Sequence, residues 1–203
     1  MSNLPPFETS VAQFTTSPFT RAWPEAVALD AFFRYCVKRF HDFCRANPRA
    51  WLTEADLQSL LAGILREELP RHGLPAHAVH QGYSVALRPE GAKTARSIVI
   101  NISLLIPDTV QHQPEQRGLG VLSLAAAVRY GSGPSARLES SLQQLASLRS
   151  CYSQSLLYLV VMAYAEETAM GERAQQAAQA ADITLLYDNY RGLAEPVQQE
   201  RLL

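Results

Sequence analysis

The first part of the chain shows the spacing of two amphipathic helices. The first pattern begins at Pro24, a favoured opening residue of a helix, and runs to Asn47-Pro48. The second begins at Thr53, which with Asp56 has the spacing of a capping box. The apolar stripes are Leu29, Phe32, Phe33, Cys36, Val37, Phe40 and Cys44 in the first, and Leu57, Leu60, Leu61, Ile64 and Leu65 in the second. We expect Pro70, Gly73 and Pro75 to end the second helix.

Beyond Pro75 the period changes to alternation and short apolar runs, which are typical of strands. Strands are predicted over residues 78–87, 97–106, 121–130, 156–164 and 183–187, and helices over 137–152 and 172–181. Three strands in succession favour hairpins, whereas the later alternation of strands and helices favours parallel crossovers. The sequence therefore predicts an α/β fold with a mixed central sheet of about five strands, helices on both faces and an N-terminal helical extension.

The same patterns divide the chain into three parts. Residues 1–22, with Pro5, Pro6 and Pro18, are interpreted as an extended arm, and residues 191–203 as a polar tail. Residues 23–190 are predicted to form one α/β domain, with the long helix within 23–50 and a core over 53–165.

Composition narrows the class of protein. The chain has 203 residues, 47% of them hydrophobic, and a net charge of −1, which excludes general disorder and binding of nucleic acid through bulk charge. No apolar run is long enough for a membrane helix, and the N-terminus lacks the features of a signal peptide. Cys36, Cys44 and Cys151 form no C-x-x-C pair, which is typical of reduced thiols. A cytoplasmic location is therefore expected.

Familiar chemical motifs are absent from the sequence. It contains neither a phosphate-binding glycine loop nor a nucleophile elbow. His72, His77 and His80 do not have the spacing of zinc ligands, so we predict no metal site there. A row of basic residues follows the polar side of the first helix: Arg34, Lys38 and Arg45, with Arg49 beyond. This row is interpreted either as a solvated face or as a surface that binds a partner.

Four residues carry a resemblance to a known family. Glu54 opens the second helix, Asn101 lies in the strand Ile98-Val99-Ile100-Asn101-Ile102, and the next strand ends Ala127-Val128-Arg129-Tyr130-Gly131. With the helix and buried strand that follow, this order resembles the PD-(D/E)XK nuclease superfamily, which has the restriction-endonuclease-like fold. In that family, acidic residues at the matching positions hold Mg²⁺ on the scissile phosphate, and a lysine orients the attacking water.

This sequence departs from the family pattern at three of the four positions. Asn101 stands in place of the aspartate, Ala127 in place of the glutamate and Arg129 in place of the lysine. One remaining carboxylate, Glu54, is not enough to hold a hard divalent cation. The resemblance therefore implies an inactive site without a cofactor. In an alternative register Asp108 would be a metal ligand, with Glu115 or Glu139, and the protein would be an active Mg²⁺-dependent nuclease.

Three hypotheses for function follow. The leading one is a non-catalytic protein that keeps a nuclease-like fold and binds a partner, for instance in bacterial defence or toxin immunity. A protein partner is favoured; nucleic acid is the other candidate, through a local patch of Arg129, Arg34, Lys38 and Arg45, and self-association is left open. The alternatives are the active nuclease with a migrated site at Asp108, and an unrelated α/β scaffold protein.

Overall fold

The computed structural model describes residues 23–47, 53–87, 94, 96–106, 121–131, 136–149, 152–163 and 175–189. The helices are α1 (Ala26–Ala46), α2 (Glu54–Arg71) and α3 (Ala136–Leu148), with a 3-10 turn at Ala76–Ala78 and a short helical segment at 175–180. The strands are β1 (Val79–Leu87), β2 (Arg96–Ile106), β3 (Val121–Gly131), β4 (Leu156–Ala163) and β5 (Thr184–Asn189). The predicted arm, residues 1–22, and the tail, residues 191–203, lie outside the described residues.

The strands form one mixed sheet in the order β1-β2-β3-β4-β5. β1, β2 and β3 pair antiparallel, whereas β3, β4 and β5 run parallel to one another. The parallel pairs need crossover connections, which α3 supplies between β3 and β4 and the segment at 175–180 supplies before β5. The predicted mixed sheet with an N-terminal helical part is confirmed, and the order from α2 to β4 is the one that the family resemblance implies.

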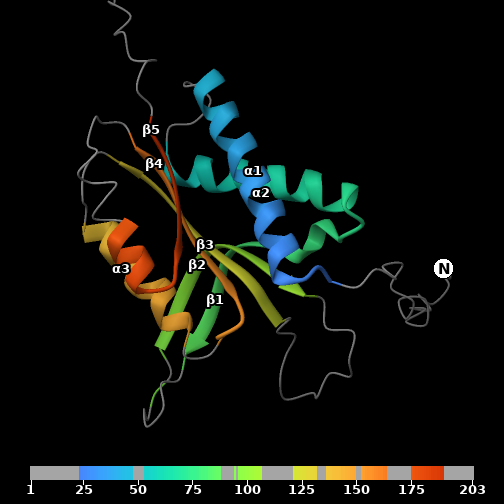
Figure 1. Ribbon diagram of the computed structural model, residues 1–203. Helices are drawn as coiled ribbons and strands as arrows, with labels where there is room; N and C mark the ends of the chain where they lie inside the picture. The colour runs from blue at the N-terminus through green and yellow to red at the C-terminus, as the bar shows by residue number, and fades with distance from the viewer. Residues whose placement is uncertain are drawn as a thin grey trace, which may run out of the picture.

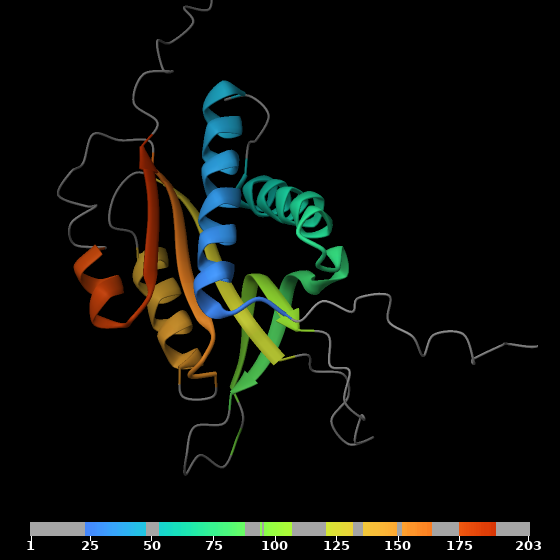
Figure 2. The ribbon, with the colours of Figure 1, turned by 45° about the vertical axis from the view of Figure 1, so that its right-hand side comes forward.

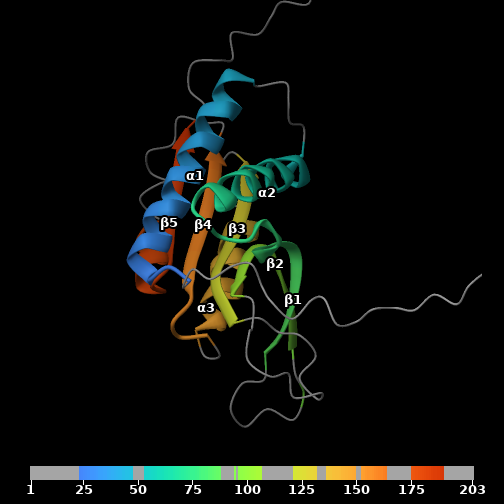
Figure 3. The same cartoon turned by 90° about the vertical axis from the view of Figure 1, so that its right-hand side faces the viewer.

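Helices cover both faces of the sheet (Figures 1 and 2). On one face, α1 lies over β4 and β5, and α2 lies over the strands of the β1–β2 hairpin and β3 (Figure 3). On the other face, α3 and the segment at 175–180 pack against the sheet. Two buried apolar layers result, one on each face. Residues of the predicted helix stripes and of the predicted strands are buried, among them Phe32, Cys36, Phe40, Leu57, Leu61, Ile64, Ile100, Val128, Leu159 and Val161.

The start and end of α2 show how local sequence sets its limits. Thr53 and Asp56 form the predicted capping box: the Thr53 hydroxyl accepts the Asp56 amide, and the Asp56 carboxylate accepts the Thr53 amide. The helix ends at Arg71, between Pro70 and Gly73, within the group of residues predicted to end it, and Pro70 lies in its last turn. A proline in a last turn still accepts hydrogen bonds through its carbonyl, and here that carbonyl accepts the amide of Gly73. Gly73 then turns the chain at a positive φ of 72°.

Buried polar contacts join α1 to its neighbours. Glu68 of α2 is 3% exposed and pairs with Arg39 of α1 and with Arg71. The Tyr158 hydroxyl of β4 donates to the Asp30 carboxylate of α1 at 2.5 Å. These contacts join α1 to α2 and to β4. None of the described helices combines the length and apolar character that crossing a membrane requires.

Candidate functional site

The first candidate site lies where the ladder between β2 and β3 ends. Backbone pairing joins residues 102–106 of β2 to residues 121–126 of β3. Just beyond that ladder, the Asn101 side-chain oxygen accepts the backbone N–H of Val128 at 3.0 Å. The side chain of Asn101 in β2 thus accepts a hydrogen bond from a backbone N–H of β3. A buried backbone N–H needs such an acceptor where the regular pairing between the two strands has stopped. We call the region around Asn101, Val128 and Arg129 the fork.

Arg129 fills the fork with its guanidinium group. Its Nε donates to the Ser141 hydroxyl of α3 at 2.6 Å, and its Nη1 donates to the Asn101 oxygen at 3.1 Å. The same Nη1 reaches the Val128 carbonyl at 3.1 Å and the Glu54 carboxylate at 3.5 Å. The donors in these bonds are Nε and Nη1 of a side chain that is only 20% exposed. Arg129 therefore ties together β2, β3, α2 and α3.

Glu54 reaches the fork because the capping box sets where α2 begins. As the first residue of α2, Glu54 lies at the positive end of the helix dipole, which favours a carboxylate. One carboxylate oxygen accepts the backbone N–H of Tyr130 at 3.3 Å, and the other faces Arg129. The negative charge of Glu54 is thus already balanced by a guanidinium within the protein.

The structure brings together most of the residues selected from the family resemblance. Arg129 contacts both Glu54, from the start of α2, and Asn101, from the neighbouring strand β2. Ala127 is buried toward α3 and lines a cavity of about 10 Å³ beside Asn101 and Arg129. That space holds about one water molecule. Arg129 as a binding residue stays a prediction.

The alternative metal site cannot be placed in the same way. Asp108 and Glu115 lie outside the described residues, and Glu139 is an exposed residue of the first turn of α3. Within the described ranges, no three His, Cys, Asp or Glu side chains gather closely enough to hold a metal ion. At the fork, the donor set is one ion-paired carboxylate, one amide oxygen and one hydroxyl, which does not suit Mg²⁺.

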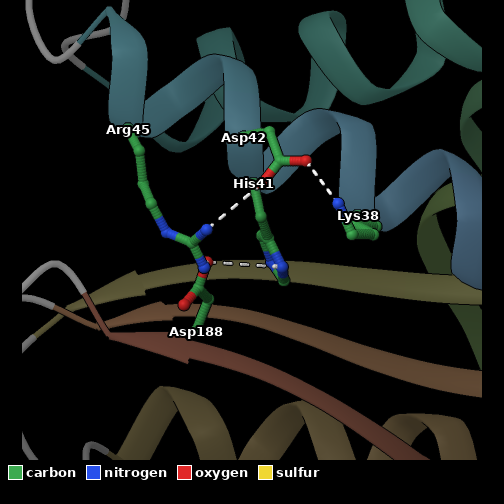
Figure 4. Close-up of polar contacts among 5 residues, drawn as sticks. All are labelled: Lys38, His41, Asp42, Arg45 and Asp188. Atoms are coloured by element: carbon green, nitrogen blue, oxygen red, sulfur yellow. Dashed lines mark hydrogen bonds and ion pairs between the residues drawn. The ribbon is translucent and has the colours of Figure 1, made fainter.

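The second candidate surface is the basic row of α1. Arg34 binds Asp30 at 2.9 Å, and Lys38 binds Asp42 at 2.8 Å. Arg45 binds Asp42 at 3.2 Å and also pairs with Asp188 of β5 (Figure 4). Each of the three cations thus has a carboxylate of the same chain beside it. The row predicted from sequence exists, but its positive charge is balanced locally; Arg49 lies outside the described residues.

His41 is a residue of this surface that the sequence analysis did not select. It is 8% exposed, with Nδ1 3.6 Å from the Asp188 carboxylate and Nε2 without a hydrogen-bond partner in the described part of the chain (Figure 4). Burial lowers the pKa of His41 to about 4, although the Asp188 charge acts in the opposite direction. The ring is therefore neutral near pH 7. His41 lies four residues after Val37 and three before Cys44, both in the apolar stripe of α1, and this spacing was a sign in the sequence that His41 is buried.

A groove of about 430 Å³ separates α1 from β5. The α1 wall carries Arg34, Lys38, Asp42 and Arg45, with Val37 and His41 deeper. The β5 wall carries the consecutive residues Leu185, Leu186 and Tyr187. Because successive side chains of a strand point to opposite faces, a groove lined by all three follows the edge of the strand.

Comparison with known proteins gives little further information. No family model matches the chain, and no curated protein sequence matches it. Among solved structures, NucC of P. aeruginosa ATCC27853 in its cAAA-bound form is similar, with a TM-score of 0.42 and 10% sequence identity. The match covers 81% of this chain and 75% of that chain. A likeness this weak says nothing about what this chain binds or catalyses.

Proposed function

We propose that this protein is a non-catalytic binding subunit built on a nuclease-like fold. The observation that supports this proposal is the set of bonds made by Arg129 at the fork. In the family that the sequence resembles, this place belongs to a lysine beside metal-bound carboxylates. Here it holds a permanent cation, which repels a divalent metal ion and pairs with the carboxylate of Glu54.

The chemistry of the fork supports the same proposal. Mg²⁺ loses its water ligands reluctantly and is usually held by carboxylates together with substrate phosphates. Glu54 is the carboxylate of the fork, and its two oxygens already accept bonds from Arg129 and the Tyr130 amide. Recruiting it to a metal would break the contacts that join α2 to β3. The fork is better suited to holding elements together than to hydrolysis.

The binding role is assigned to the face formed by α1 and β5. Three cations and the carboxylates Asp30, Asp42 and Asp188 alternate there, so the face has little net charge. A polyanion such as nucleic acid gains affinity from uncompensated positive charge, which this face lacks. A protein surface with its own alternating charges is the better complement, and this favours a protein partner.

A cleavage assay tests the absence of catalysis. Purified protein is incubated with single- and double-stranded DNA and with RNA in Mg²⁺ and in Mn²⁺, and we expect no cleavage. As a matched control, the triple variant Asn101→Asp, Ala127→Glu, Arg129→Lys restores the family residues. This variant should gain a rise in melting temperature with Mn²⁺ that the natural chain does not show.

Two results would contradict the proposal. Cleavage by the natural chain that is lost in Asp108→Ala would establish the migrated-site nuclease. Cleavage that is lost in Glu54→Gln would show that the fork itself is catalytic despite its bound guanidinium. Absence of cleavage, with a metal response in the restored variant alone, would support both the inactive site and its location.

A further inference from the structure

We infer that the outer half of the β1–β2 hairpin, residues 83–87 and 96–100, is a flap that swings open about Gly82 and Asn101, and that Arg129 is the latch that holds it closed. This half of the hairpin is called the flap below. The inference goes beyond the proposed binding role and does not depend on the absence of catalysis. It gives the bonds of Arg129 a use, which is to control access to the apolar layer beneath α3.

The first observation is that the hairpin changes core layer halfway along its length. Alternate side chains of a strand face the same side, so those of Ile100 and Ile102 should share a layer. Instead, Ile102 packs in the layer beneath α1 and α2, whereas Ile100 packs in the layer beneath α3. On β1 the same change separates Val79 from Val85. The hairpin therefore rolls about its own axis between its inner half and the flap.

The second observation is that both neighbouring ladders are irregular where this roll occurs. The register of β1 with β2 skips one pair, Gly82 with Asn101. Gly82 has a φ of 61°, which glycine adopts readily and other residues adopt only at a cost. At the same level β2 leaves β3, because their ladder ends at Ile102 and Ala126. A glycine-dependent bend thus coincides with the end of a ladder, and this combination makes the position a pivot.

The third observation is that the flap has few attachments. Its two strands pair with each other and with no further strand of the described part. One face packs in the layer beneath α3 through Val85, Leu87, Ile98 and Ile100, whereas the other face is exposed at Ser84, Ala86, Ser97 and Val99. A two-stranded hairpin is at best marginally stable by itself, so its packing beside α3 must hold it. Segments with so few contacts open at a lower free energy than the whole fold.

Arg129 joins the pivot to elements that do not belong to the hairpin. Its Nη1 donates to the Asn101 side-chain oxygen at 3.1 Å, and its Nε donates to the Ser141 hydroxyl of α3 at 2.6 Å. The same Asn101 oxygen accepts the Val128 amide of β3 at 3.0 Å. These bonds hold β2 to β3 and α3 where the ladder no longer does. The flap cannot swing away from β3 without breaking the bond between Arg129 and Asn101.

Opening enlarges a space that already exists beneath the flap. The cavity of about 10 Å³ at the fork is lined by residues of the flap, β3 and α3, among them Ile98, Ile100, Ala127, Leu145 and Leu148. Ala127 is 7% exposed and packs in the layer beneath α3. Ala125 packs in the same layer, but it lies where the ladder is intact and pairs with Ser103. An open flap therefore uncovers position 127 and leaves position 125 covered.

Cysteine labelling at these two positions tests the flap. Ala127→Cys and Ala125→Cys are treated separately with N-ethylmaleimide, and peptide mass spectrometry gives the modification rate at each site relative to the chain unfolded in urea. This relative rate reports the fraction of molecules in which the site is open. The thiol introduced at position 127 should react about 10-fold faster or more than the one at position 125. The buried thiol of Cys36 reports global unfolding in the same samples.

Two further variants separate the latch from the pivot. Arg129→Met removes the donors but keeps an unbranched side chain, and it should raise the rate at position 127 about 10-fold. Gly82→Ala should raise it about 5-fold, because alanine is strained at this φ even though nothing lies within 4 Å of the added Cβ. In both variants the rates at position 125 and at Cys36 should change far less. Arg34→Met, at an exposed position of α1, is the matched control and should leave every rate unchanged.

Three results would overturn the inference. Equal rates at positions 127 and 125 in the otherwise natural chain would show that no flap opens. An equal rise at position 127, position 125 and Cys36 in Arg129→Met would mean that Arg129 stabilises the whole fold and is not a latch. An unchanged rate at position 127 in Gly82→Ala would remove the pivot. None of these results would alter the cleavage assay.

Discussion

Replacing His41 by glutamine should remove much of the loss of stability that acid causes in this protein. Burial lowers the pKa of His41 from an ordinary value of 6.5 to about 4, against the opposing effect of Asp188. Arg45 also lowers this pKa, whereas Asp42 raises it. In the unfolded chain the ring is exposed to water and regains its ordinary pKa. Between these two values, the unfolded state binds more protons than the folded state.

The sign and size of the effect follow from linkage. Stability is fully present above pH 6.5 and decreases as the pH falls toward 4, because protons then favour the unfolded chain. The full difference in pKa corresponds to about 3 kcal/mol, at about 1.4 kcal/mol for each pH unit. Lowering the pH from 7 to 5 should by itself remove about 2 kcal/mol of the free energy of unfolding.

Urea denaturation at a series of pH values measures this effect. His41→Gln keeps a polar side chain beside Asp188 but does not titrate, so its free energy of unfolding should change much less between pH 7 and pH 5. His77→Gln, at an exposed position, is the matched control and should follow the natural chain. The pKa of His80 is also lowered, mainly by burial, so some pH dependence will remain in His41→Gln. Equal pH dependence in His41→Gln and the natural chain would refute the reasoning.

Further predictions concern stability and are measured by urea denaturation at pH 7. Phe40→Ala should lower the free energy of unfolding by about 3–5 kcal/mol because Phe40 is fully buried. Val27→Ala, at an exposed position of α1, should change it by less than about 0.5 kcal/mol. Similar values for the two variants would contradict the packing of α1. Arg39→Ala should destabilise the protein more than Glu68→Leu does. Loss of Arg39 leaves the buried carboxylate of Glu68 with fewer partners, whereas Glu68→Leu removes that charge. The reverse order of stability would refute this reasoning. Thr53→Ala should cost about 1 kcal/mol through the lost capping box, and no loss would show that Asp56 alone starts α2.

Much of the fold could be predicted from local patterns. The spacing of Leu29, Phe33 and Phe40 in α1 reflects one buried helix face, which any helix on a sheet requires. The β-branched run near Ile100 and the apolar run near Val160 reflect burial in strands. Thr53 and Asp56 fixed the start of α2 because a capping box depends on neighbours only a few residues away. The end of α2 was less certain, since Pro70 is tolerated in a last turn.

The candidate site was predicted only in part. The approach of Glu54, Asn101 and Arg129 followed from the resemblance to a family, but the bonds among them did not. Arg129 has four protein acceptors because α2, α3 and two strands meet at the fork. No spacing within the sequence shows that its Nε and Nη1 are already bonded within the protein. Likewise, the basic row of α1 was visible, but Asp188, which neutralises part of it, lies 143 residues from Arg45 along the chain.

By itself, the sequence determined which segments are helices and strands, which of their faces are buried, and that Asn101, Ala127 and Arg129 differ from the residues of the nuclease family that the sequence resembles. These properties depend on side-chain type and on spacing over a few residues. Only the tertiary structure decided that Arg45 is paired with Asp188, that His41 is buried beside Asp188, and that β5 is the last strand of the described sheet. Those properties depend on segments far apart in the chain. Charge and burial act through space, and the sheet order sets which residues share that space.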